Sequence, residues 1–175
     1  MFKIHELNKI LIESGLDAQI RHHKKEDWNR VIKQSKFVPT VYAWDFLNYN
    51  SAYFQSFSES SSDISLIIYH DKIPCAVWPI AFDPSDKEPL KTVNKLYGGI
   101  VVPPIFIDNF QKKSQRVIVK SCIRFLNNML KLSHGDCWRT NELSIEGSMG
   151  QWHQIALEMG AILDRVNYDM YMDLS

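Results

Sequence analysis

Hydrophobic and polar positions along this chain follow two periods, one typical of helices and one typical of strands. Apolar side chains recur every three or four residues in four stretches, at 3–14, 28–35, 109–134 and 150–161. This spacing predicts amphipathic helices with one face toward a core.

A further helix is expected in the aromatic-rich stretch 41–57, with a break near Asn48–Asn50. Asp27 stands where an acidic residue can cap the helix that follows it.

Strand patterns occupy much of the rest of the chain. Two apolar runs flank His70-Asp71-Lys72 within residues 64–83 and predict a β-hairpin. Further strands are expected at 18–24, 94–107, 138–147 and 165–175. The strand at 94–107 is interrupted by a glycine pair and stopped by Pro103-Pro104. Strands joined first by a hairpin and later by helices predict an α+β fold, with a mixed, mostly antiparallel twisted sheet and helices on both faces.

Composition limits the class of protein. The chain has 175 residues, an ordinary domain length, and 45% of them are apolar, which is enough for a core. Its 20 basic and 20 acidic residues balance, so there is no basic excess of the kind that nucleic-acid binders carry. Three cysteines without paired spacing indicate reduced thiols. No apolar run is long enough to span a membrane, and we expect a cytoplasmic protein.

Four segments in this order resemble one family. They are DWNRVIKQSKFVPTVYAWDFL, the hairpin ISLIIYHDKIPCAVWPIAF, LYGGIVVPP and YDMYMDLS. Together they are similar to the FemAB-like branch of the GNAT (N-acyltransferase) superfamily. The resemblance implies a GNAT-like fold over 1–175 and N-acyl transfer, in which an amine attacks an activated carbonyl in cell-envelope or polysaccharide metabolism.

The family carries two GNAT-like domains in tandem, and a strand that ends in a stretch like Asp173-Leu174-Ser175 leads into the second. The resemblance therefore implies that this chain is the N-terminal, acceptor-side domain and that its partner domain lies outside it. The alternative is a complete single-domain relative, which could be a non-catalytic GNAT-like binding or interaction domain. The reading frame beyond Ser175 would discriminate between them.

The expected donor site departs from the family's pattern. A GNAT domain holds the donor's pyrophosphate with backbone N–H groups at a helix start, within a glycine-containing signature. The corresponding stretch, 103–117, contains no glycine and begins with two prolines, which have no N–H. We therefore expect this domain alone to bind no cofactor, although acyl-CoA or aminoacyl-tRNA would serve the full-length family.

Several residues are candidates for binding an envelope-precursor or other small-molecule acceptor. Tyr42, Trp44, Tyr49 and Tyr53 form an aromatic cluster. The resemblance places this segment near the acceptor cleft and favours Tyr42 and Trp44 as binding residues. Core packing is their alternative role.

Three further candidates, Tyr97, Gly98 and Gly99, could form a bulge that a ligand approaches, or only a β-bulge. Arg139, at the start of a strand, could bind an anion or be an ordinary solvated charge. The sequence identifies no catalytic residue, and no histidine pair has the spacing of a metal site.

The closing strand at 165–175 also predicts self-association. Its aromatic and apolar residues alternate with polar ones, and an edge strand leaves backbone groups that another chain can pair with. We expect a two-fold homodimer through this strand or through the aromatic segment 42–54.

Overall fold

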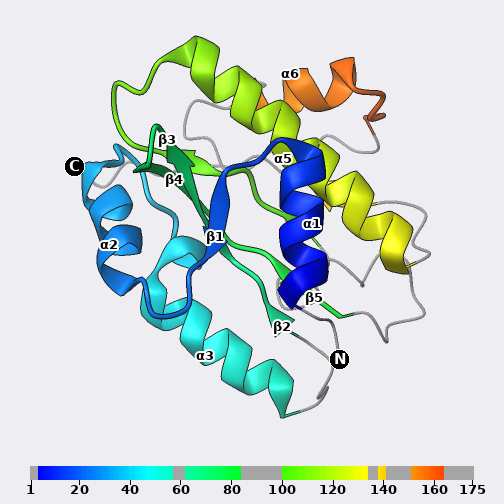
Figure 1. The fold of residues 1–175 in the computed structure, drawn as a ribbon. Helices are drawn as coiled ribbons and strands as arrows, with labels where there is room; N and C mark the ends of the chain where they lie inside the picture. Colours follow the sequence, from blue (N-terminus) through cyan, green and yellow to red (C-terminus); the bar gives the residue numbers. More distant parts are fainter. Residues whose placement is uncertain (1–3, 57–61, 84–99, 134–137, 141–150, 164–175) are drawn as a thin grey trace.

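The computed structural model describes residues 4–56, 62–83, 100–133, 138–140 and 151–163 (Figure 1). These residues form helices and short strands in the order expected from the sequence, and the α+β class is confirmed. The expected strand at 165–175, and the Tyr97-Gly98-Gly99 stretch, lie outside the described residues.

The main sheet has four strands in the order β1-β3-β4-β7, all antiparallel to their neighbours. Their bounds are Ala18–Ile20, Leu66–His70, Ile73–Trp78 and Ile105–Phe106. The central pair, β3 and β4, is the predicted hairpin. Asp71 and Lys72 form its two-residue turn with φ of 51° and 66°, the left-handed backbone that matches the twist of the flanking strands.

The hairpin continues past an interruption as a second, shorter pair. Strands β2 (Ser62–Asp63) and β5 (Ala81–Phe82) pair antiparallel, and the N–H of Ile64 donates to the carbonyl of Ile80 between the two pairs. Pro79, which has no N–H, interrupts the ladder at this point. The Ser65 hydroxyl accepts from the Ile80 N–H at 3.1 Å, so a side chain satisfies the backbone where the ladder is broken.

Helices cover both faces of the main sheet, as predicted (Figure 1). On one face lie α1 (Ile4–Ser14), α5 (Lys112–Ser133) and α6 (Gln151–Glu158). On the other lie α2 (Lys25–Gln34), the short 3-10 helix η1 (Thr40–Tyr42) and α3 (Trp44–Gln55).

Alternate side chains of the two central strands separate the core into these two layers. Leu66 and Ile68 contact the layer of α1 and α5, whereas Ile67 between them contacts the layer of α2 and α3. On β4, Trp78 and Val77 are divided in the same way. Because both faces are covered, these strands read as continuous apolar runs.

One parallel strand pair stands apart from the antiparallel sheet. Strand β6 (Ile100–Val101) pairs parallel to β8 (Arg139–Thr140), and α5 lies between them in the chain. Strand β7, which follows β6 after three residues, pairs instead with β4. Pro103-Pro104 lie at this division, and the prediction that they stop the strand is confirmed: β6 ends before them, and extended pairing resumes at Ile105 with a different neighbour.

Other local expectations are also corrected. Lys24, not Asp27, is the N-cap of α2, and it makes no side-chain capping hydrogen bond. Helix α3 has no break near Asn48–Asn50. The Asn48 side chain bonds Arg21 rather than its own backbone, so it does not compete with the helix. On α5 the apolar side chain of Val117 is exposed, whereas that of its neighbour Ile118 is buried. No helix in the described part of the chain is long and apolar enough to cross a membrane.

Candidate functional site

The most polar place in the core is built around Arg21, directly after β1. Its backbone N–H donates to the carbonyl of Ser65 at 2.8 Å. This bond extends the pairing of β1 with β3 by one residue. Beyond it the chain turns, with the Lys24 N–H bonded to the Arg21 carbonyl and His23 at φ of 62°. The side chain of Arg21 points inward and is almost fully buried.

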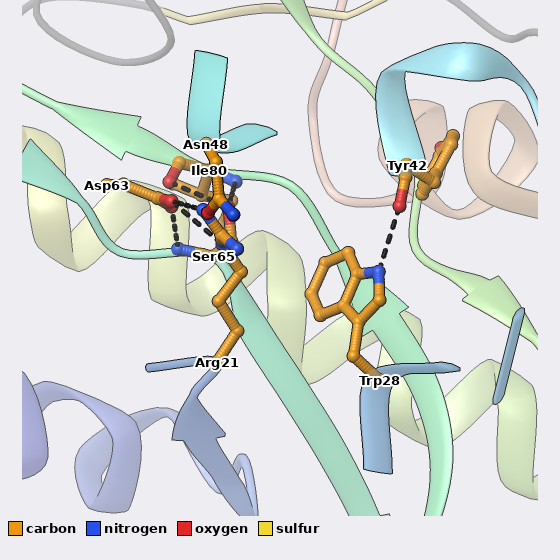
Figure 2. Close-up of polar contacts among 7 residues, drawn as sticks. All are labelled: Arg21, Trp28, Tyr42, Asn48, Asp63, Ser65 and Ile80. Atoms are coloured by element: carbon orange, nitrogen blue, oxygen red, sulfur yellow. Dashed lines mark hydrogen bonds and ion pairs between the residues drawn. The ribbon is translucent and has the colours of Figure 1, made fainter. Parts of the chain in front are cut away.

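Asp63 on β2 neutralises this arginine. One carboxylate oxygen, Oδ2, accepts from Arg21 Nε at 2.8 Å and from Nη2 at 2.6 Å (Figure 2). The other oxygen, Oδ1, accepts from the backbone N–H of Ser65 at 2.9 Å. A buried carboxylate is tolerated when it is paired with a charge and hydrogen-bonded, and Asp63 has both kinds of partner.

Helix α3 closes the site from the other side. Asn48 Oδ1 accepts a hydrogen bond from Arg21 Nη2 at 2.9 Å, and the guanidinium lies 4.4 Å from the centroid of the Trp44 ring. Arg21 Nη1 makes no hydrogen bond. Among the described residues, it is the one buried side-chain nitrogen or oxygen without a partner. The cluster therefore ties α3 to β1 and β2 with one polar donor still able to form a bond.

The predicted residues Tyr42 and Trp44 lie beside this cluster, in the core layer under α2 and α3. Tyr42 is fully buried, its hydroxyl donates to the carbonyl of Pro103, and its own carbonyl accepts from Trp28 Nε1 at 2.8 Å (Figure 2). Trp44 is half-buried and packs edge-on against Trp28. Tyr42 thus presents no free surface in this structure, whereas Trp44 keeps part of its ring accessible.

Arg139 is exposed at the start of β8 and lies beside Ile100 in the parallel pair. The next residue, Thr140, points inward. Its hydroxyl donates to the Val101 carbonyl at 2.7 Å and accepts from Trp152 Nε1 at 2.6 Å. These bonds fix the strand, so Arg139 is a surface charge on a rigid support.

The structure brings Tyr42 and Arg139 to the same stretch of chain. Tyr42 bonds Pro103, and Arg139 pairs with Ile100, the residue that follows Gly99 in the sequence. It does not bring Trp44 there, because that ring faces Arg21.

Burial keeps the two thiols that the structure describes in their neutral form. Burial raises the pKa of Cys75 to about 12, and it raises the pKa of Cys122 well above the ordinary value. A thiol with such a pKa holds almost no thiolate at neutral pH, and the thiolate is the reactive form. Among the residues that the structure describes, no three His, Cys, Asp or Glu side chains gather to hold a metal ion.

Reasoning from the sequence missed Arg21, Asn48 and Asp63. Arg21 and Asp63 are 42 residues apart, and Asp63 ends a run of serines that has the composition of a surface loop. No local pattern distinguishes such a pair from solvated charges. No family model, no curated protein and no solved structure matches this chain.

Proposed function

We propose that this chain is the acceptor-side domain of a FemAB-like N-acyltransferase and that it binds no acyl-CoA on its own. The amine nitrogen of the acceptor would attack the carbonyl carbon of an activated ester or thioester. The new C–N bond replaces the ester or thioester bond, and the amine loses a proton. The observation that carries this proposal is the parallel pair of β6 and β8 around α5, set in an otherwise antiparallel arrangement.

The segment between β7 and α5 supports the second part of the proposal. Its N–H groups donate within the protein: Ile107 to the Cys75 carbonyl at 3.0 Å, and Asp108 to the Gln34 carbonyl at 2.7 Å. The N–H of Phe110 donates to the Ile107 carbonyl at 3.3 Å. A pyrophosphate cradle needs such N–H groups to face the ligand, and these three already have acceptors.

Arg139 is the residue through which we expect the acceptor to bind. It is exposed on a fixed strand, and envelope precursors carry phosphates and carboxylates that an arginine fork can hold. Trp44, whose ring is partly accessible, and Tyr97-Gly98-Gly99 remain the other predicted contacts, whereas Tyr42 is enclosed in the core.

Calorimetric titration of the chain tests the proposal. One ligand is acetyl-CoA, and the other is a nucleotide-linked muramyl pentapeptide with a free side-chain amine. The same precursor with that amine acetylated is the matched control. We expect the free-amine precursor to bind and acetyl-CoA not to bind.

Two variants locate the contact. Arg139→Ala should weaken precursor binding by about threefold or more, the size of one exposed charge contact. Arg124→Ala removes an exposed arginine from α5 and should change nothing. A low-micromolar, one-to-one complex with acetyl-CoA, or an equal effect of both variants, would contradict the proposal.

A non-catalytic binding domain is the second candidate. It is favoured by the burial of the Arg21–Asp63 pair and of the two described thiols, which the core encloses. The reading frame beyond Ser175 separates the two functions. A second GNAT-like domain encoded there supports the transferase, and a stop codon supports the binding domain.

A further inference from the structure

We infer a binding site on the solvent-facing side of α3. The acyl-transfer proposal does not use this surface. Five exposed residues share this side of the helix: Asp45, Asn48, Tyr49, Ala52 and Tyr53. Their spacing of three, four, seven and eight residues places them on one stripe. We call these five residues the α3 face.

Two aromatic rings, stacked on one another, form the apolar part of the α3 face. Tyr49 and Tyr53 are one helical turn apart, with ring centroids 6.1 Å apart and planes inclined by only 12°. Tyr49 is 66% exposed and Tyr53 49%. Two parallel, accessible tyrosine rings at a fixed spacing are unlike the other aromatics of this helix layer, because Trp28, Tyr42 and Trp44 pack inward.

Polar groups flank the rings. The bond from Arg21 to Asn48 Oδ1 fixes that amide, so the Nδ2 group keeps two donors in a defined orientation. The Asp45 carboxylate is highly exposed, 3.8 Å from Lys25 Nζ, and it accepts hydrogen bonds. The side chain of Ala52 is small, so it leaves room for a ligand beside the two rings.

Charge excludes several kinds of partner. Helix α3 contains no lysine or arginine, and Asp45 is its one charged residue. A surface for phosphates or nucleic acid carries clustered cations. The α3 face instead offers rings, an amide and one carboxylate.

Size favours a small ligand over a second copy of the chain. A helix of 12 residues is about 18 Å long and about 10 Å across. A strip of this size is far below the about 800 Å² per partner of a stable protein interface. The α3 face is matched to a small ligand with one flat apolar side and polar edges.

We propose that the α3 face binds carbohydrate. The C–H side of a pyranose ring lies against the open face of the stacked Tyr49 and Tyr53 rings, which carries negative charge density, and the sugar hydroxyls pair with Asp45 and Asn48. The proposal rests only on α3 and Arg21, and it holds whether or not the chain takes part in acyl transfer.

Titration of the ¹⁵N-labelled chain with chitotriose, cellotriose and maltotriose, followed by NMR, tests this. We expect at least one of them to shift the amide signals of α3, with a Kd of about 0.1–1 mM, ordinary for one small stacked contact. Tyr49→Ala and Tyr53→Ala should each weaken binding by about tenfold, because one aromatic stack is lost. Tyr49→Phe should keep it within about threefold, since the ring remains.

A control variant on α1 tests whether the loss of sugar binding is specific to the α3 face. Ile12→Ala removes an exposed apolar side chain from α1 and should leave sugar binding unchanged. All of these side chains are exposed, so thermal unfolding should be unaltered in every variant.

Two results would overturn the proposal. One is that none of the three sugars shifts α3. The other is sedimentation showing a dimer that Tyr49→Ala dissociates, which would assign the α3 face to a second copy. Since neither an amine nor an acyl donor is present, a negative result here does not bear on the acyl-transfer proposal.

Discussion

The guanidinium of Arg21 and the carboxylate of Asp63 lie 2.6 Å apart in an ion pair that the core encloses, with 1% and 2% of the two side chains exposed. The pair joins the end of β1 to β2, and through Asn48 it also holds α3. Desolvation of both charges is costly, so such a pair orders the fold without adding much net stability. The pair matters for stability because a single buried charge without its partner would be strongly destabilising.

Removing one partner should therefore destabilise the chain more than removing both. Arg21→Met leaves the Asp63 carboxylate buried and unpaired, and we expect a loss of about 3–5 kcal/mol in the free energy of unfolding. Arg21→Met combined with Asp63→Leu should recover most of this loss. Urea denaturation measures both, with Lys9→Met as the control at an exposed ion pair. A double variant no more stable than Arg21→Met would contradict this account.

The bond between the Tyr42 hydroxyl and the Pro103 carbonyl joins η1 to the segment where the sheet divides. Tyr42→Phe leaves the ring in place and removes only the donor, so we expect a loss of about 1–3 kcal/mol from the unsatisfied carbonyl. Tyr49→Phe, on the exposed side of α3, should change stability by less than about 0.5 kcal/mol. Loss of precursor binding by Tyr42→Phe at unchanged stability would instead assign Tyr42 to the acceptor site.

Cys75 should resist alkylation in the folded protein. Burial raises its pKa from 9.0 to about 12, which lowers the thiolate fraction about a thousandfold. In a Cys137→Ser background, iodoacetamide at about pH 8 should label Cys75 and Cys122 only after urea is added. Mass spectrometry counts the labels. Rapid labelling of the native chain at either cysteine would show that this part of the core opens readily.

Tyr69 should make stability fall at high pH. Burial, together with the hydrogen bond that its hydroxyl donates to Asp27, raises its pKa from 10.0 to about 12. The unfolded chain thus loses the proton first. The stabilising contribution is complete below pH 10 and is lost as the pH rises from 10 to about 12.

Thermal unfolding of the parent and of Tyr69→Phe across this pH range measures the effect. The parent should lose more stability than the variant, because the variant has no hydroxyl to ionise. The difference between the two curves removes the contribution of lysines and other groups that titrate in the same range. Parallel curves would mean that Tyr69 ionises equally in the folded and unfolded chains.

The sequence by itself determined the local structure of this protein. It predicted the hairpin of β3 and β4, its turn at Asp71-Lys72, and α5. Each of these depends on a hydrophobic period or a backbone preference within a few residues. The sequence also predicted that both faces of the sheet are covered, because the apolar runs of β3 and β4 have no polar side to turn toward water.

The tertiary structure alone decided which similar residues serve which purpose. Tyr42 and Tyr49 belong to one aromatic stretch, yet the first is in the core and the second faces solvent, because only one side of each helix meets the sheet. Arg21 and Asp63 look like surface charges until the chain brings them together across 42 positions. Such pairings depend on which faces of distant elements meet, and a local pattern carries no information about that meeting.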